Sequence, residues 1–340
     1  MSHATKKLPK IVLFATGGTI VSSGDDPTQL TGYSIKDFSV DALLSSVPAL
    51  SRAAELEARQ VANIDSSSMR SSVWADLAEA VQAAAQRSDV DGIVITHGTD
   101  TMDETAFLLN LVLDTEKPVV MTGAMRPATA ISADGPLNLL NAVRTAASPE
   151  AAGKGVLVVL NDTIVAAREA QKINTTNAAA FSGHDLSAIG MIAGDDIVFT
   201  GMSVKPHTTA CEFTVAEFAE AVRAGRLPRV DILCAHADDD GALAQACAKL
   251  GAEAIIYMGT GNGSVHEDAE RALLAAKLPV VRATRVPGGC VTEGLARWQE
   301  QGFVPAGTLT AQKARILAQL VLIDRSGDAA ARLKAAFLKY

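Results

Sequence analysis

Eight short runs rich in valine and isoleucine constrain the fold of this chain more than any other feature. In chain order they are KIVLFAT, GIVITH, PVVMTG, GVLVVL, DIVFTG, VDILCAH, AIIYMG and PVVRAT. Segments such as SVWADLAEAVQAAAQR and LNLLNAVRTAAS lie between them and repeat apolar residues three and four apart, which is typical of helices with one buried face. Because apolar strands that alternate with helices favour a sheet covered on both faces, we predict an α/β protein with largely parallel sheets.

The length of the chain and one polar segment predict two α/β domains. A chain of 340 residues exceeds the usual size of one domain. The polar segment lies within 202–229, carries two prolines and separates the fifth apolar run from the sixth. We therefore predict a larger N-terminal domain over 1–201 with a mostly parallel sheet, a connection over 202–229, and a smaller parallel-sheet domain over 230–340.

Charge and cysteine usage narrow the possible partners. The net charge is -8 and the longest basic run is Lys6-Lys7, so no basic stripe for nucleic acid is present. No apolar stretch approaches the roughly 20 residues of a membrane span, and the start leads directly into an apolar strand. The four cysteines lack metal-ligand spacing, so neither a metal site nor a disulfide framework is expected. We expect a cytoplasmic protein, or a periplasmic one if a signal was removed.

The stretch ATGGTI places two glycines between two threonines at the end of the first apolar run. It lacks both the GxGxxG pattern and the lysine of a phosphate loop, so a phosphate cradle is weakly supported. The glycines could form an ordinary turn, or they could present Thr16 or Thr19 as a reactive hydroxyl. The polar segment that follows and ends at Tyr33 is either a surface loop or an active-site lid.

The stretch ITHGTDTMDETAFLL joins a predicted strand to a predicted helix. Thr101 and Glu104 have the spacing of a capping box, which predicts a helix start at Thr101. Thr99 and Asp100 then lie at a helix N-terminus, where backbone N–H groups favour an anion, although all these polar residues could simply cap the helix. We predict that His97 is buried and hydrogen-bonded rather than catalytic.

Three further segments carry polar residues beside predicted strands. Lys172 is either a solvated lysine or, in a dry site beside an aspartate, a base for a threonine hydroxyl. The serines of NIDSSSM are typical of a turn. Arg126 and Asp134 lie in a glycine- and proline-containing loop, where they could orient a substrate or tie the loop down.

Taken together and in their order, these motifs resemble the bacterial-type L-asparaginase family. The motifs are FATGGTI, NIDSSSM, GIVITHGTDTMDETA, PVVMTGAMRP, SADGPLNLLNAV, GVLVVLNDTIVAAREAQKINTTN, GTGNGS and GTLTAQKAR. The resemblance runs from about Lys10 to near the C-terminus. It implies two α/β domains and a homotetramer built as a dimer of intimate dimers. It also implies hydrolysis of L-asparagine to L-aspartate and ammonia through an acyl-enzyme, without a metal or organic cofactor.

The resemblance also implies roles for individual residues. The catalytic set is the nucleophile Thr19, the lid tyrosine Tyr33, and the second threonine with its acid/base partners, Thr99, Asp100 and Lys172. The substrate-binding set is Gly18, Ser66, Ser67, Ala124, Asn262 and Glu293. Gly18 gives the substrate room to approach Thr19, and Ser66 binds the α-carboxylate while Asp100 also holds the α-ammonium. Backbone N–H groups near Thr99 or Ala124 stabilise the oxyanion, and Asn262 reaches in from the neighbouring subunit.

This chain departs from the family pattern at three places. Ser67 stands where well-studied members have a glutamine or glutamate that contacts the substrate's amino group, so we expect weaker affinity and little glutaminase activity. Glu293 is only the nearest carboxylate to the partner-subunit glutamate of some members. No cysteine precedes Cys211, so the disulfide of some secreted members is missing, which agrees with a reducing compartment.

Three alternatives remain beside the asparaginase interpretation. An ammonia-releasing amidotransferase subunit shares the two threonine motifs but carries an additional N-terminal domain. An amino-acid-binding or sensor protein would retain the pocket and have weak or no catalysis, and an ammonia assay separates it from an enzyme. A nucleotide-binding protein is disfavoured because the phosphate-loop residues are absent.

Overall fold

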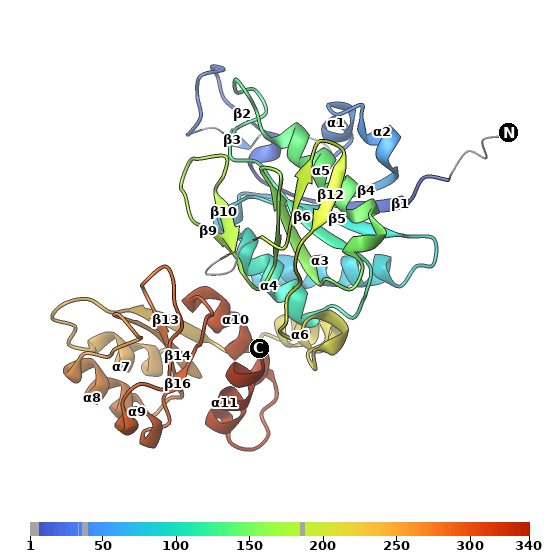
Figure 1. Ribbon diagram of the computed structural model, residues 1–340. Helices are drawn as coiled ribbons and strands as arrows, with labels where there is room; N and C mark the ends of the chain where they lie inside the picture. Colours follow the sequence, from blue (N-terminus) through green and yellow to red (C-terminus); the bar gives the residue numbers. More distant parts are fainter. Residues whose placement is uncertain (1–6, 33, 36–39, 184–187) are drawn as a thin grey trace, which may run out of the picture. The chain divides into compact units, whose positions relative to one another are not determined.

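The chain folds into two compact α/β units. The computed structural model describes residues 7–32, 34–35, 40–183 and 188–340, and its contacts divide the chain into Met1–Ala219 and Glu220–Tyr340 (Figure 1). The division lies inside helix α6 (Val215–Arg223), so the predicted connection over 202–229 contains a helix. Among the helices of the described residues, none is long and apolar enough to cross a membrane.

The first unit contains an eight-stranded sheet with the order β12-β11-β8-β7-β6-β5-β1-β4. Five neighbouring strands, from β7 to β4, are parallel, and the other three continue the sheet antiparallel. The strands are β1 (Lys10–Gly17), β4 (Glu55–Ile64), β5 (Gly92–Thr96), β6 (Val119–Thr122), β7 (Val156–Leu160), β8 (Thr163–Ala166), β11 (Gly190–Ala193) and β12 (Asp196–Phe199). Every residue of β1 after Lys10 is buried, as its continuous apolar sequence predicts.

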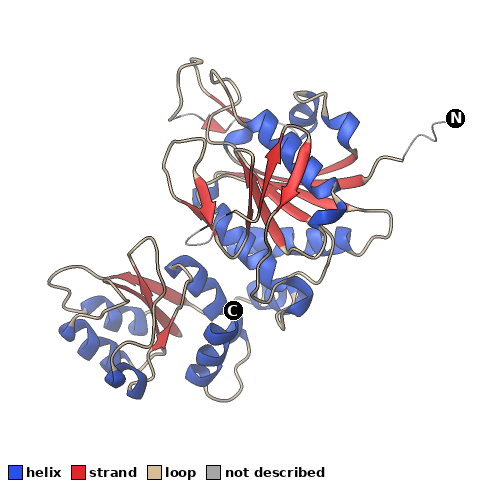
Figure 2. Ribbon diagram, viewed as in Figure 1, coloured by secondary structure: helices blue, strands red, loops and turns tan. Residues whose placement is uncertain are grey.

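Helices cover both faces of this sheet (Figure 2). On one face α1 (Val40–Ser45), α2 (Leu50–Ala53) and α5 (Gly135–Ala147) pack with alternate residues of the central strands. On the other face lie α3 (Ser71–Ala85) and α4 (Met102–Val112) (Figure 1). The prediction of a largely parallel, doubly covered sheet is confirmed.

Short elements complete the first unit. Two small antiparallel ladders pair β2 (Ser22–Ser23) with β3 (Ser34–Ile35) and β9 (Ala170–Lys172) with β10 (Phe181–Gly183). Single 3₁₀ turns are η1 (Thr19–Val21), η2 (Ser66–Ser68), η3 (Pro149–Ala151) and η4 (Thr208–Ala210). Both η1 and η2 directly follow the carboxyl end of a strand, where α/β sheets place their ligands.

The second unit is a four-stranded parallel sheet with the order β13-β14-β15-β16. Its strands are β13 (Val230–Cys234), β14 (Ala254–Gly259), β15 (Val280–Thr284) and β16 (Val304–Pro305). One face packs with α7 (Ala242–Lys249), α8 (Glu267–Ala276) and Trp298 of α9 (Ala296–Glu300). The remaining helices, α10 (Ala311–Ile323) and α11 (Ala329–Lys339), pack against each other, and α10 also contacts β13, β14 and β15.

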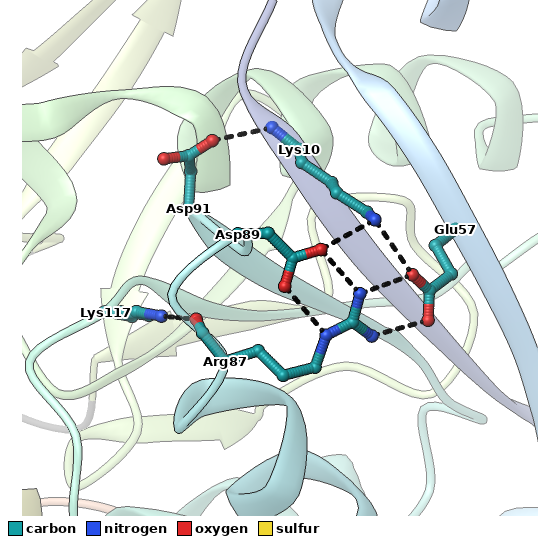
Figure 3. Close-up of polar contacts among 6 residues, drawn as sticks. All are labelled: Lys10, Glu57, Arg87, Asp89, Asp91 and Lys117. Atoms are coloured by element: carbon teal, nitrogen blue, oxygen red, sulfur yellow. Dashed lines mark hydrogen bonds and ion pairs between the residues drawn. The ribbon is translucent and has the colours of Figure 1, made fainter.

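A cluster of charged side chains lies at the amino ends of β1, β4 and β5. Glu57 accepts two bonds from the Arg87 guanidinium, at 2.7 and 2.8 Å, and Lys10 Nζ lies 3.3 Å from the same carboxylate (Figure 3). We call this group the amino-edge cluster; its members are Lys10, Glu57, Arg87, Asp89, Asp91 and Lys117. Because the cluster lies at the opposite ends of these strands from Thr19 and Thr99, it serves below as a reference position outside the pocket.

Candidate active site

A pocket opens in the first unit where β1, β4 and β5 end. Its volume is about 640 Å³, part of it open to solvent. Four of the predicted catalytic residues line it: Thr19, Thr99, Asp100 and Lys172. Gly18 and Ser66 of the predicted substrate-binding set line it as well. The three hydroxyl-bearing side chains are largely buried, since Thr19, Thr99 and Ser66 are 8%, 5% and 3% exposed.

Lys172 joins the second threonine to the aspartate. Its Nζ donates to Thr99 Oγ1 at 2.9 Å and to Asp100 Oδ1 at 2.6 Å. Lys172 ends strand β9, while Thr99 and Asp100 follow β5, so the contact links two segments that are distant in sequence. The structure places Lys172 beside an aspartate, as the second interpretation requires, but the site is not dry, because the Asp100 side chain is 56% exposed.

The two threonines around the glycine pair differ in their surroundings. Thr16 is buried and its hydroxyl donates to the carbonyl oxygen of Thr96 at 3.0 Å, which holds β1 to β5. Thr19 lies in the pocket wall at the start of η1. Thr19 is therefore the hydroxyl of this pair that a ligand in the pocket can reach.

The glycines of ATGGTI are required by close backbone packing. A Cβ on Gly17 would lie 2.6 Å from the backbone of Ile64, and a Cβ on Gly18 would collide with the backbone of Gly98. Gly17 and Gly18 also have φ values of +105° and +91°, which side-chain-bearing residues rarely adopt. The sequence interpretation explains glycine at this place by the room that it gives the substrate. The structure adds that β1 and the Gly98 segment could not approach each other with side chains there.

Ser66 is tied to the segment that follows β5. Its Oγ accepts the N–H of Asp100 at 3.0 Å, and Thr101 Oγ1 donates to its carbonyl oxygen at 2.8 Å. The predicted helix start at Thr101 is confirmed, since Thr101 is the N-cap of α4. The side-chain cap predicted for Thr101 is wrong, because its hydroxyl bonds to Ser66 and not to its own helix. A tertiary contact has replaced the local cap, and Thr101 becomes a positioning residue that the capping pattern concealed.

His97 is buried and fully hydrogen-bonded, as predicted. Nδ1 lies 2.6 Å from the carbonyl oxygen of Gly98, and Nε2 lies 3.0 Å from Thr105 Oγ1. Because a carbonyl only accepts, Nδ1 carries the proton, and the Thr105 hydroxyl, which accepts from Trp74 Nε1, donates to Nε2. Burial lowers the pKa of His97 to about 4, so its ring is neutral at neutral pH.

The loop after β6 is held by Asp134. The two carboxylate oxygens accept the backbone N–H groups of Met125 and Arg126, each at 2.9 Å. Arg126 donates to the carbonyl oxygen of Ser132, so both charged residues of this segment hold the loop rather than face the pocket. Ala124 is buried and outside the pocket lining, although its neighbour Met125 belongs to that lining.

Three further predicted residues, Ser67, Asn262 and Glu293, are outside the lining of this pocket, as Ala124 is. Ser67 is exposed, and its backbone N–H donates to Asp65 Oδ1 at 2.9 Å. Asn262 and Glu293 belong to the second unit, where the Asn262 amide exchanges two hydrogen bonds with Thr292, at 2.8 and 2.9 Å. Tyr33 lies outside the described residues, although its neighbours Thr31 and Gly32 line the pocket.

The sequence reasoning missed several pocket residues. They are Asp65, Gly98, Met125, Thr175 and Thr176. Leu30, Thr31 and Gly32 also line the pocket and belong to the segment interpreted as a surface loop or a lid. Asp65 had a recognisable signal, because a carboxylate directly before the serine of NIDSSSM must lie near whatever that serine binds. Among the residues that the structure describes, no three His, Cys, Asp or Glu side chains are grouped so that they could hold a metal ion.

Comparison with known proteins identifies the family. The model for the N-terminal domain of asparaginase matches residues 10–205, and the model for the glutaminase/asparaginase C-terminal domain matches residues 229–337. The chain is 41% identical over 320 residues to L-asparaginase 2 of Bacillus subtilis (strain 168), covering 93% of this chain and 83% of that protein. It is 39% identical over 324 residues to the glutaminase-asparaginase of Acinetobacter glutaminasificans, covering 94% and 96%.

A solved structure shows the same architecture along almost the whole chain. The crystal structure of a probable cytoplasmic L-asparaginase from Campylobacter jejuni superposes with a TM-score of 0.91 at 39% identity. The match covers 98% of this chain and 100% of the other. Both family models and these relatives agree with the motifs that gather at the pocket, and the chain belongs to the asparaginase family.

Proposed function

We propose that this protein hydrolyses L-asparagine to L-aspartate and ammonia, with Thr19 as the nucleophile. The observation that carries the proposal is the pocket in which Thr19 lies with the Lys172 contact to Thr99 and Asp100. An isolated threonine hydroxyl is a poor nucleophile, so a site that uses it needs an adjacent group that accepts its proton. The names of the relatives, L-asparaginase and glutaminase-asparaginase, indicate an amide substrate.

Ser66 is suited to bind the α-carboxylate of the substrate. Its Oγ already accepts the Asp100 N–H, so the hydroxyl proton remains available to donate to an anion. The α-ammonium then lies close to the same serine, because both groups are on one carbon. One carboxylate oxygen of Asp100 already accepts from Lys172 at 2.6 Å, so Asp100 is only partly available to bind the ammonium. We assign part of the ammonium recognition to Asp65, which supplies the contact that Ser67 is too short to make.

The proposed reaction proceeds through an ester. Thr19 Oγ attacks the side-chain amide carbon, the new C–O bond forms, and the electron pair of the carbonyl moves to its oxygen. The hydroxyl proton passes to the Thr99, Lys172 and Asp100 set, which returns a proton to the departing nitrogen. Ammonia leaves, and water then hydrolyses the aspartyl ester and restores the Thr19 hydroxyl.

We propose a preference for asparagine over glutamine. Ser67 does not line the pocket, so the direct amino-group contact that a longer side chain gives in other members is replaced. Both L-asparaginases and glutaminase-asparaginases occur among the relatives. Ammonia release at matched concentrations of the two amino acids should give a much lower kcat/KM for glutamine, and equal values would contradict the preference.

We further propose a homotetramer in which Asn262 and Glu293 serve the site of a partner subunit. Light scattering coupled to gel filtration, at the concentration of the activity assay, should give about four times the chain mass of 35.3 kDa. A fully active monomer would refute this arrangement. A cytoplasmic location is supported by four free cysteines, of which Cys234 and Cys290 are exposed. Cell fractionation tests it.

The decisive experiment compares two threonine variants. Thr19→Ala removes the proposed nucleophile, and Thr16→Ala removes a buried hydroxyl three residues away that contacts only the backbone of β5. We expect Thr19→Ala to abolish ammonia release while the protein remains folded, and Thr16→Ala to lose stability but retain turnover. Near-normal turnover by a folded Thr19→Ala protein would refute the assignment. Asparagine binding without turnover in the unmodified protein would favour the sensor alternative.

A further inference from the structure

The loop that follows β6 packs directly against the Thr99 segment. We call residues Gly123–Arg126 the 123–126 loop. A Cβ on Gly123 would lie 2.5 Å from the carbonyl oxygen of His97 and 3.3 Å from the methyl group of Thr99, so the loop backbone and this segment are in contact. Met125 of the same loop lines the pocket. A small displacement of the loop would therefore change the wall beside Thr99.

Two side chains at the start of α5 hold this loop through its backbone. Asp134 accepts from the N–H groups of Met125 and Arg126. Asn138, one turn later and buried, donates from Nδ2 to the carbonyl oxygen of Gly123 at 3.0 Å and to Asp134 Oδ2 at 3.1 Å. Its other amide atom, Oδ1, accepts the N–H of Asn161 at 3.0 Å. The loop is thus fixed at both ends by one turn of one helix.

Asp134 forgoes the usual role of an aspartate at its position. It is the N-cap of α5, where such a side chain normally accepts N–H groups of its own helix, but it makes no cap hydrogen bond. Its carboxylate instead accepts two N–H groups of the 123–126 loop and the side-chain amide of Asn138. Directly after it, a Cβ on Gly135 would lie 2.9 Å from Ile20 Cγ1 and 3.3 Å from Ala124 Cβ, so the helix start presses on the residue next to Thr19.

Two backbone donors of the loop are left over. The N–H groups of Gly123 and Ala124 have no hydrogen-bond acceptor among the described residues, and both residues are buried. Buried N–H groups without partners are rare in native proteins and call for an explanation such as a ligand that supplies the acceptor. Of the two, the Ala124 N–H lies between two groups that are held in place, because the Gly123 carbonyl is bound by Asn138 and the Met125 N–H by Asp134.

We propose that Asp134 and Asn138 are positioning residues for catalysis, which hold the Ala124 N–H where it stabilises the oxyanion. This inference rests on the proposed function, since the oxyanion forms when Thr19 attacks the amide carbon. A donor of this kind acts on the transition state more than on the bound substrate, so its misplacement lowers kcat and leaves KM nearly unchanged. A purely structural role of the two residues would lower stability without this selective effect on kcat.

Helix α5 offers a matched control for each variant. Asn141 is also buried, lies three residues after Asn138, and donates to Asp162 Oδ1 at 2.7 Å, away from the 123–126 loop. Asn138→Ala and Asn141→Ala therefore delete the same side chain from the same helix. Asp134→Asn and Asp162→Asn form the second pair, in which each aspartate loses its charge while its bond from an asparagine of α5 is disturbed.

The experiment measures kcat, KM and Tm of all four purified variants with L-asparagine. We expect Asn138→Ala and Asp134→Asn to lower kcat at least tenfold with KM changed less than threefold. The controls should lose similar stability but retain kcat within threefold. Equal kcat losses in each pair, or full kcat in both loop variants, would overturn the inference. If Asn138→Ala does not fold, the aspartate pair decides. Failure of the proposed function appears separately, as lack of turnover by the unmodified protein.

Discussion

Replacement of Lys172 by methionine tests the proton-transfer set most directly. The ammonium group makes two contacts, 2.9 Å to Thr99 Oγ1 and 2.6 Å to Asp100 Oδ1, and methionine retains the length of the side chain without any donor. Asp100 is 56% exposed, so water solvates its carboxylate when the lysine is lost, and the free energy of unfolding should fall by only about 1 kcal/mol. Loss of a positioned acid or base costs about 10²- to 10⁴-fold in rate. Activity should therefore fall far more than stability.

The assay is coupled ammonia release at saturating asparagine, with thermal unfolding of the same samples. Lys117→Met is the matched control, because Lys117 donates to the Arg87 carbonyl in the amino-edge cluster, and it should retain full kcat. Lys172→Arg separates charge from proton transfer, since a guanidinium does not release its proton in proteins and this variant should also be inactive. The reasoning is refuted if Lys172→Met retains kcat within threefold, or if Lys172→Arg is fully active.

Three further variants test separate parts of the structure. Asp65→Asn keeps an acceptor for the Ser67 N–H but removes the negative charge. We expect kcat/KM to fall about tenfold for asparagine and to stay unchanged for succinamate, which lacks the α-amino group. Equal losses for the two substrates would argue against ammonium recognition by Asp65. Thr101→Val keeps the shape of the side chain but loses the hydrogen bond to the Ser66 carbonyl. The free energy of unfolding should fall by about 1 kcal/mol and KM should rise. An unchanged KM would contradict a role of Thr101 in positioning Ser66. The Arg87 guanidinium lowers the pKa of Glu57 to about 2, so this ion pair stabilises the fold above the pKa of the unfolded carboxyl and loses its contribution as the pH falls from about 4.5 to 2. Because Glu57 is 44% exposed, we expect the free energy of unfolding to fall by only about 1 kcal/mol over this pH range. Acid unfolding curves should show this loss in the unmodified protein and not in Glu57→Gln.

The sequence predicted the parts of the fold that depend on local patterns. The continuous apolar run of β1 indicated a buried parallel strand, and the structure confirms it, whereas the run DIVFTG forms β12, an antiparallel edge strand with partly exposed residues. Strand β4 was not predicted, because it lies at the sheet edge and its sequence ELEARQVANI alternates partly exposed residues instead of forming an apolar run. Edge strands often carry charged side chains, which discourage pairing of the exposed edge with another chain. A search for apolar runs alone therefore misses such strands.

In the candidate site, too, the sequence predicted some features and not others. Family motifs predicted that Thr19, Thr99, Asp100, Lys172 and Ser66 belong together, and all of them line one pocket. No local pattern could show how the contacts are shared. Thr101 bonds to Ser66 although its spacing to Glu104 predicts a cap, and Asp134 binds the loop after β6 although it begins a helix. In both cases a partner distant in sequence competes with the local one, and only the folded structure decides between them.

The close packing of Gly18 on the Gly98 segment limits how this enzyme could be redesigned. A library that randomises Gly17 and Gly18 would contain many variants whose new side chain overlaps backbone atoms. Asp65, Thr175 and Thr176 line the same pocket and are not glycines. A search for altered substrate range should therefore vary these positions and keep Gly17 and Gly18, because a side chain at either glycine would overlap backbone atoms.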